Sequence, residues 1–185
     1  MKKLSIIIMS LVVMSSCSTT KEGKSSRAEV RNEKKLVEQG MVKNAVETRR
    51  YIIKLNRLYL NHGGTAELIP RANFIIIDGD KAVISTAYLG RQYDIKPIAG
   101  INMRGRAVEY ALTNNTSKGS YNIKMTVKNG RSASFDVYIT ITKNGFCNAS
   151  LSSLKIDNVR YSGYLVPISD TPDKLEKQAQ EGDLI

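Results

Sequence analysis

Apolar and polar residues alternate along two neighbouring segments of the chain, 121–128 and 133–142. The apolar positions of the first are Tyr121, Ile123, Met125 and Val127. Those of the second are Ala133, Phe135, Val137, Ile139 and Ile141. A period of two places every apolar side chain of a segment on one face. Both segments are therefore predicted to be strands with one face in a core and the other in solvent.

Three dipeptides fit the centre of a two-residue hairpin turn, which needs positive φ: Asp78-Gly79, Asn129-Gly130 and Asn144-Gly145. They predict three antiparallel pairings: 74–77 with 82–86, 121–128 with 132–142, and 132–142 with 146–151. Further strands are expected at 50–58, 66–69, 106–112 and 159–166. No crossover helix of useful length separates these segments, so parallel pairing is disfavoured.

The predicted fold is mainly β (α+β), an antiparallel meander of about eight or nine strands over residues 48–168. A sheet of this size must be closed or covered. A barrel and a sheet covered by an N-terminal helix both satisfy that requirement.

Residues 27–47 precede the strands and are predicted to form an amphipathic helix. Ser26 and Glu29 have the spacing of a capping box at its start. The apolar stripe consists of Val30, Val37, Met41 and Ala45. We expect this helix to pack on the β domain, and residues 169–185 to form a polar C-terminal tail.

The chain begins with two lysines, an apolar run over 4–14 and two serines before Cys17. This resembles a bacterial lipoprotein signal peptide, and the run is too short to span a bilayer, which takes ~20 residues. The resemblance implies removal of residues 1–16 and lipidation of Cys17, with 17–26 as a tether. It places the protein on a membrane surface, and we expect the outer membrane with the domain facing the periplasm.

The chain carries 28 Lys and Arg against 17 Asp and Glu, a net charge of +11. Residues 48–168 hold 17 of the basic and 7 of the acidic residues, a net of +10 (17 − 7). Such a domain suits an anionic partner. Because the export signal argues against nucleic acid, the candidate partners are an anionic glycan, a lipid headgroup or an acidic protein. A solvated basic surface is an equally good explanation.

Catalytic patterns are missing from the sequence. His62 is the only histidine, so one chain cannot form a multi-histidine metal site, and a His-based triad would have to use this residue, which lies in a predicted loop. No nucleophile elbow, phosphate-binding glycine loop or Cys-x-x-Cys occurs. We therefore expect no enzyme, no cofactor and no metal. Cys147 follows Phe146 in a predicted strand, which favours a buried, inert thiol.

Two segments combine tyrosine with arginine, the side chains that recognise ligands most efficiently. The candidate binding residues are Tyr88, Arg91 and Tyr93 in the first segment, with Arg160 and Tyr161 in the second. We expect the first group to project from a loop. A structural role, in which the tyrosines cap the core, fits the same pattern.

The first segment, Tyr88-Leu89-Gly90-Arg91-Gln92-Tyr93, resembles the Pro-Tyr-Phe-Gly-Arg-Ala-Tyr core motif of the domain of unknown function 4251 family. The similarity extends through Ile77-Asp78-Gly79-Asp80 and Lys143-Asn144-Gly145 to Arg160-Tyr161-Ser162-Gly163-Tyr164, about residues 48–168. Ala87, Leu89 and Gln92 depart from the motif. The resemblance implies a small secreted or lipidated protein of Gram-negative gut anaerobes and leaves its activity open.

Two functions follow from these observations. The first is a non-enzymatic, lipid-anchored envelope protein that binds an anionic ligand or partner. The second is a structural or assembly subunit of an envelope complex without a small-molecule ligand. A concave surface lined by tyrosine and arginine would favour the first, and a filled barrel with a flat apolar patch would favour the second.

Overall fold

The computed structural model describes residues 22–61, 63–89, 100–130 and 133–168. It contains one helix and nine strands within those ranges. The elements are α1 (Glu22–Glu47), β1 (Arg50–Tyr59), β2 (Thr65–Glu67), β3 (Phe74–Asp78), β4 (Lys81–Ala87), β5 (Gly100–Asn115), β6 (Ser120–Asn129), β7 (Ala133–Thr142), β8 (Phe146–Ser153) and β9 (Ile156–Pro167).

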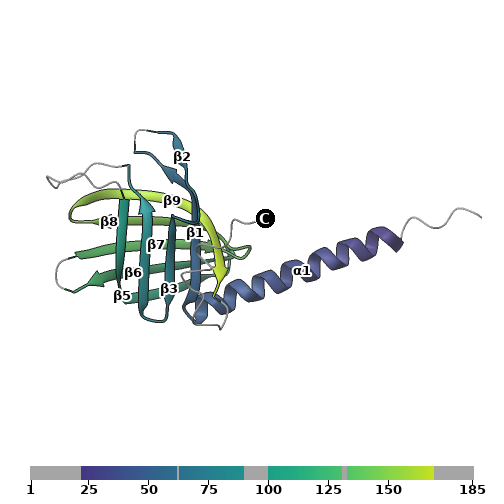
Figure 1. Cartoon of the computed structure of the whole chain (residues 1–185). Helices are drawn as coiled ribbons and strands as arrows, with labels where there is room; N and C mark the ends of the chain where they lie inside the picture. Colours follow the sequence, from purple (N-terminus) through teal and green to yellow (C-terminus); the bar gives the residue numbers. More distant parts are fainter. Residues whose placement is uncertain (1–21, 62, 90–99, 131–132, 169–185) are drawn as a thin grey trace, which may run out of the picture. The chain divides into compact units, whose positions relative to one another are not determined.

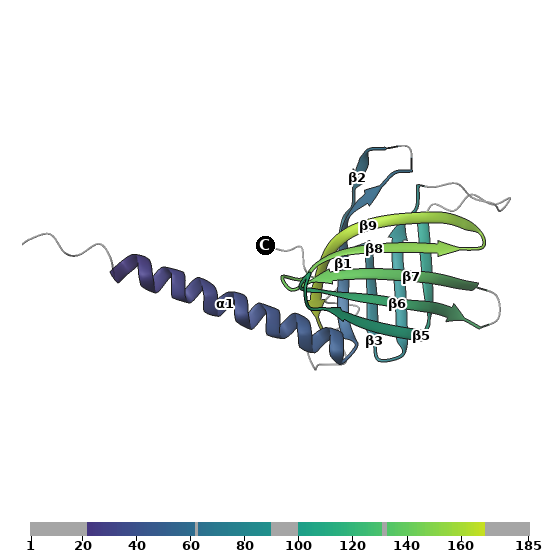
Figure 2. The same ribbon diagram turned by 180° about the vertical axis from the view of Figure 1, so that it is seen from behind.

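The strands form one antiparallel sheet that closes on itself (Figures 1 and 2). β3 to β9 follow one another as a meander, and β1 pairs with β3 on one side and β9 on the other. Eight strands therefore make a barrel, and the short β2 pairs with the far end of β1. The predicted antiparallel fold is confirmed. Of the two arrangements that the sequence left open, the strands adopt closure, which removes the exposed edges.

All three predicted hairpins are present, but each uses only its glycine at positive φ. The first turn is centred on Gly79-Asp80, because Asp78 still pairs with Lys81. A turn centred on Asp78-Gly79 would bring Asp80 opposite Ile77, on the face that points into the barrel. Burial of a carboxylate there is costly, so the core sets the register and overrides the dipeptide preference.

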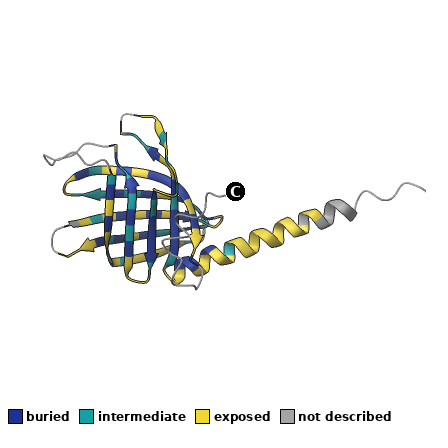
Figure 3. Cartoon of the chain, in the orientation of Figure 1, coloured by how far each residue is buried: buried dark blue, intermediate teal, exposed yellow. Residues whose placement is uncertain are grey.

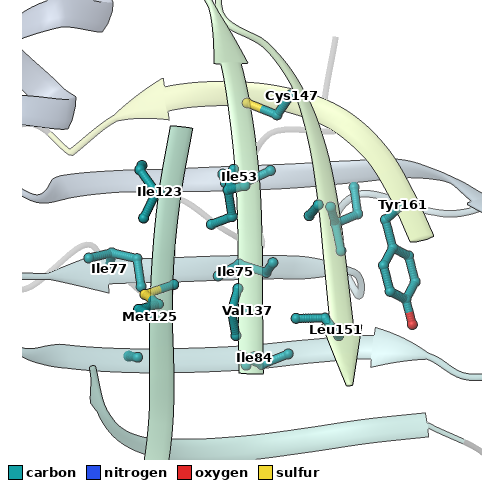
Figure 4. Packing of buried hydrophobic residues seen from close by; sticks show 14 of the residues in the cluster. Ile53, Ile75, Ile77, Ile84, Ile123, Met125, Val137, Cys147, Leu151 and Tyr161 are labelled. Atoms are coloured by element: carbon teal, nitrogen blue, oxygen red, sulfur yellow. The ribbon is translucent and has the colours of Figure 1, made fainter. Parts of the chain in front are cut away.

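Inward-facing side chains fill the barrel (Figures 3 and 4). Ile53, Ile75, Ile84, Val137 and Leu151 are all buried, and they come from five different strands. The alternation in β6 and β7 accounts for this directly, since Ile123 and Met125 point inward and Ile139 is buried as well. The described inward-facing residues thus form the hydrophobic core of the barrel.

The helix differs from its prediction in extent and packing. It begins at Glu22, so Ser26 lies within it and residues 22–26 of the expected tether are helical. Val30, Val37 and Met41 of the predicted stripe are exposed. Among the side chains of α1 whose burial is described, the buried ones lie in the last turns, where Val42, Ala45 and Val46 join the core of the barrel. The expected packing on the β domain thus involves three residues near the end of the helix.

Cys147 is fully buried, as the sequence predicts. Burial raises the pKa of its thiol to about 12. At neutral pH the side chain is therefore protonated, and it donates a hydrogen bond to the carbonyl oxygen of Gly145 at 3.2 Å. A protonated, inaccessible thiol is inert towards oxidants and metals.

Candidate functional site

A hollow of about 270 Å³ opens on the outer face of the barrel, over β7, β8, β9 and the end of β1. We call it the trough. Its lining residues are Tyr59, Tyr138, Thr140, Asn148, Ala149, Ser150, Arg160 and Tyr161. Most of them occupy the outward positions of their strands, between core residues such as Val137 and Ile139. The trough is therefore lined mainly by the outward-facing, polar positions of the alternating strands.

Cross-strand register aligns four of the lining residues in one row. Tyr138 pairs with Ser150, Ser150 with Arg160, and Arg160 with Tyr59. With about 4.8 Å between neighbouring strands, the backbones that carry the two tyrosines lie about 14 Å apart. The tyrosines thus stand at the two ends of the row, with the serine and the arginine between them.

Each tyrosine is accompanied by a cation. The guanidinium carbon of Arg160 lies 5.9 Å from the ring centre of Tyr59. Lys124 on β6 places its ammonium nitrogen 5.7 Å from the ring centre of Tyr138. Within the described part of the chain, neither cation forms an ion pair with an acidic side chain. A ring face attracts a cation without neutralising it, so both charges remain able to bind an anion.

Short polar side chains form the floor of the trough. Ser150 hydrogen-bonds to Asn158, and Thr140 donates to the Asn122 amide oxygen at 3.0 Å. Over the ranges that the structure describes, the Asn148 side chain makes no hydrogen bond. Its amide thus offers both a donor and an acceptor to a ligand.

The wall at Tyr59 is fixed from beneath. The Tyr59 hydroxyl donates to the Ser162 hydroxyl at 3.4 Å, and Ser162 is itself buried although it faces outward. This hydrogen bond holds the Tyr59 ring in place, with Arg160 beside it. A fixed wall costs less conformational entropy when a ligand binds.

The five candidate binding residues have different positions. Arg160 is exposed and lines the trough. Tyr161 borders the trough through its strand, but its ring lies in the core, as Figure 4 shows. Tyr88 is only 2% exposed, so it does not project into solvent as expected. Arg91 and Tyr93 lie outside the described residues.

Burial is also the main cause of the raised pKa of Tyr161 and of Tyr88. It raises the pKa of Tyr161 to about 12 and raises the pKa of Tyr88 in the same direction. Both hydroxyls are therefore protonated at neutral pH. Their position in the core corresponds to the structural role that the sequence also allowed.

The fold nevertheless brings the two tyrosine segments together at Ala87. The Tyr161 hydroxyl donates to the Ala87 carbonyl oxygen at 2.9 Å. The Ala87 amide donates to the side-chain oxygen of the buried Asn73 at 2.7 Å. Both backbone polar groups of Ala87 are thus held by side chains, which fixes the chain just before Tyr88.

Sequence reasoning missed Tyr59, Tyr138 and Asn148. A signal for Tyr138 was present, because an aromatic residue occupies a solvent-facing position between Val137 and Ile139. Tyr59 carries no comparable signal. It lies 101 residues before Arg160 (160 − 59), and only the pairing of β1 with β9 makes them neighbours.

The described ranges contain neither a metal-binding cluster nor a membrane-spanning helix. Residues 22–61, 63–89, 100–130 and 133–168 hold no group of three or more His, Cys, Asp or Glu side chains arranged to hold a metal ion. In the same ranges, no helix is long and apolar enough to cross a membrane.

The fold and the trough define a class: a small antiparallel barrel with a filled interior and a polar, cation-bearing hollow on its outer face. Residues 33–165 match the family model described as a domain of unknown function (DUF4251). The chain therefore belongs to this family.

A solved structure with the same fold is titled as a DUF4251 family protein from Bacteroides eggerthii DSM 20697. It is 16% identical, with a TM-score of 0.62 over 77% of this chain and 94% of that chain. At this identity the likeness concerns the fold alone. No curated protein matches the chain.

Proposed function

We propose that this protein is a non-enzymatic envelope protein that binds an anionic ligand in the trough. One observation carries the proposal: Arg160 is exposed in a concave surface, beside the ring of Tyr59, and pairs with no acidic side chain in the described ranges. Within the described residues, neither Arg160 nor Lys124 beside Tyr138 has to break an ion pair before it binds an anion, which lowers the desolvation cost of recognition.

The charge of the whole domain supports the same ligand class. Residues 48–168 carry ten more basic than acidic residues, so their field attracts anions and repels cations. The described inward-facing side chains form an apolar core, whereas the trough on the outer face is lined mostly by polar side chains. The hollow is slightly smaller than typical drug-sized sites of ~300–1,000 Å³, and suits one small unit of a ligand.

The proposed location is the outer membrane, with lipidated Cys17 as the anchor and the domain in the periplasm. The short apolar run before Cys17 supports it, since a lipid-modified residue supplies about 0.8 kcal/mol for each buried methylene. In that location the acidic partners are glycans, lipid headgroups and proteins.

A structural or assembly subunit is the second candidate. The specific observation in its favour is the exposure of Val37 and Met41 on α1, at 53% and 55%. Exposed apolar side chains on a helix suit contact with a partner protein. The two functions predict different sensitive residues, which makes them separable.

The experiment is a pull-down from envelope extract with the full-length chain in detergent. Arg160→Ala should reduce capture of the anionic partner at least fivefold, since a charge-assisted contact contributes about 1–3 kcal/mol. Arg71→Ala is the matched control, because Arg71 is exposed away from the trough and its loss changes the net charge equally. Undiminished capture by Arg160→Ala, with loss in a Val37→Ser/Met41→Ser double variant, would establish the assembly role instead.

A further inference from the structure

A second aromatic and cationic group lies on the same outer face as the trough. Phe146 on β8 and Tyr164 on β9 pack edge to face, with ring centres 5.5 Å apart and planes at 74°. Tyr164 is 51% exposed, and the register places it opposite Lys54 of β1. Among the described residues, no acidic side chain forms an ion pair with Lys54. We call Phe146, Tyr164 and Lys54 the second row.

The second row repeats the chemistry of the trough at a fixed distance. Arg160 and Tyr164 are four residues apart on one strand, as are Ser150 and Phe146 on its neighbour. At ~3.3 Å per residue the two rows are about 13 Å apart. Because both pairs have the same parity along their strands, both rows face outward.

Small polar side chains join the two rows. Asn148 lies midway on β8, between Ser150 and Phe146, and is paired with Ser162 of β9. Thr140 of β7 is paired with Asn148 on the other side. Ser162 is buried beneath Tyr59, so the path between the rows offers the exposed Thr140 hydroxyl and Asn148 amide, with an aromatic ring and a cation at each end.

We infer that the ligand is a linear acidic oligosaccharide that lies along β8 and β9 and contacts both rows; this inference rests on the proposed function. The apolar face of a sugar ring packs on an aromatic ring, as at Tyr138 and Tyr164. Carboxylate or sulfate groups pair with Arg160 and Lys54. Sugar hydroxyls exchange hydrogen bonds with Asn148 in between. A single sugar ring is too small to span both rows.

Nucleic acid is the competing polyanion, and the arrangement favours it less. Single-stranded nucleic acid binds through successive aromatic platforms, one for each stacked base. Here the stretch between the rows carries an amide and hydroxyls in place of an aromatic ring. The pattern matches a chain of hydroxylated rings better than a chain of stacked bases.

The test is isothermal titration of the full-length chain in detergent with size-defined oligogalacturonates and sulfated heparin fragments, from the monosaccharide upward. Affinity should rise at least tenfold from the monosaccharide to the trisaccharide and then level off. Tyr164→Ala should weaken trisaccharide binding about tenfold and monosaccharide binding much less, because a monosaccharide can still bind in the trough. Tyr164→Phe, which keeps the ring, should bind as the unaltered chain does. Arg160→Ala should weaken both ligands.

The outcomes separate the two proposals. Equal affinity for monosaccharide and trisaccharide, with no effect of Tyr164→Ala, would overturn the extended ligand and leave anion binding in the trough intact. Tighter binding of an oligothymidylate, also weakened by Tyr164→Ala, would replace the glycan by nucleic acid. No binding of any acidic saccharide would overturn this inference, and normal capture by Arg160→Ala in the envelope pull-down would overturn the proposed function as well. The thermal unfolding midpoint of each variant verifies that it is folded.

Discussion

The hydroxyl of Tyr161 on β9 donates a hydrogen bond to the backbone carbonyl of Ala87 at the end of β4, with 2.9 Å between the oxygens. These residues are 74 positions apart in the chain. The bond joins the two segments in which tyrosine and arginine occur together. It also separates two roles within one dipeptide, since Arg160 faces the trough while Tyr161 supports the fold.

The first prediction concerns this hydrogen bond. Tyr161→Phe keeps the ring but removes the shorter of the two side-chain hydrogen bonds to the Ala87 carbonyl, and the Thr86 hydroxyl remains as a donor at 3.4 Å. The loss should lower the free energy of unfolding by about 1 kcal/mol. Denaturant unfolding measures the loss. Tyr138→Phe is the matched control: Tyr138 is 47% exposed, so its hydroxyl can be replaced by water and stability should not change. Equal stability of the two variants would show that the bond contributes nothing.

The second prediction concerns alkaline pH. Burial raises the pKa of Tyr161 from 10.0 to about 12, so the folded state retains the proton that the unfolded state loses. The stabilisation is complete below pH 10 and disappears as the pH rises to about 12. A shift of this size amounts to ~2–3 kcal/mol. Unfolding free energies measured between pH 9 and pH 12 should fall for the unaltered chain.

Tyr161→Phe removes this titration, so its stability should fall less steeply over the same interval. Cys147 and the other buried tyrosines continue to contribute, and a residual slope remains. Parallel slopes for the two proteins would mean that Tyr161 does not carry the expected shift.

The third prediction concerns Gly163, where β9 passes close to the irregular part of β1. A Cβ atom at Gly163 would lie 2.0 Å from the carbonyl oxygen of Lys54 and 2.9 Å from the Cα of Leu55. Neither atom can retreat without loss of strand pairing, so Gly163→Ala should destabilise the barrel by about 3 kcal/mol. Thermal or denaturant unfolding measures the change.

Gly40 supplies the contrast. A Cβ atom there would meet nothing within 4 Å, and the residue lies inside α1. Gly40→Ala should therefore be neutral or stabilise by up to about 1 kcal/mol, through helix propensity. Similar effects of the two substitutions would contradict the close approach at Gly163.

The fourth prediction tests the anchor. Cys17→Ala removes the proposed site of lipidation and should move the protein from the membrane fraction into the soluble fraction. Fractionation followed by immunoblotting detects the shift. Retention of Cys17→Ala in the membrane after a salt wash would place the anchor elsewhere in the chain.

Local pattern was sufficient for most of the strands. The period of two in β6 and β7 identifies their inward faces, because side-chain direction in a strand depends only on neighbouring positions. Gly79, Gly130 and Gly145 mark the hairpins for an equally local reason, since a tight turn needs positive φ. Even β5 was partly visible, although it begins at Gly100, six residues before the predicted strand (106 − 100). Its first half pairs with β4 and its second with β6, a division that its own residues do not reveal.

Closure and the trough were decided by the tertiary structure. Whether β1 meets β9 depends on the twist and register of the whole sheet, which no single segment encodes. That contact alone places Tyr59 beside Arg160, and it positions Gly163 against Lys54. The tyrosine and arginine content of a segment predicted candidate binding residues but not the direction of each side chain. Packing determined the direction of each side chain. The rings of Tyr88 and Tyr161 are buried in the core, whereas Arg160 stays exposed because burial of a guanidinium is costly.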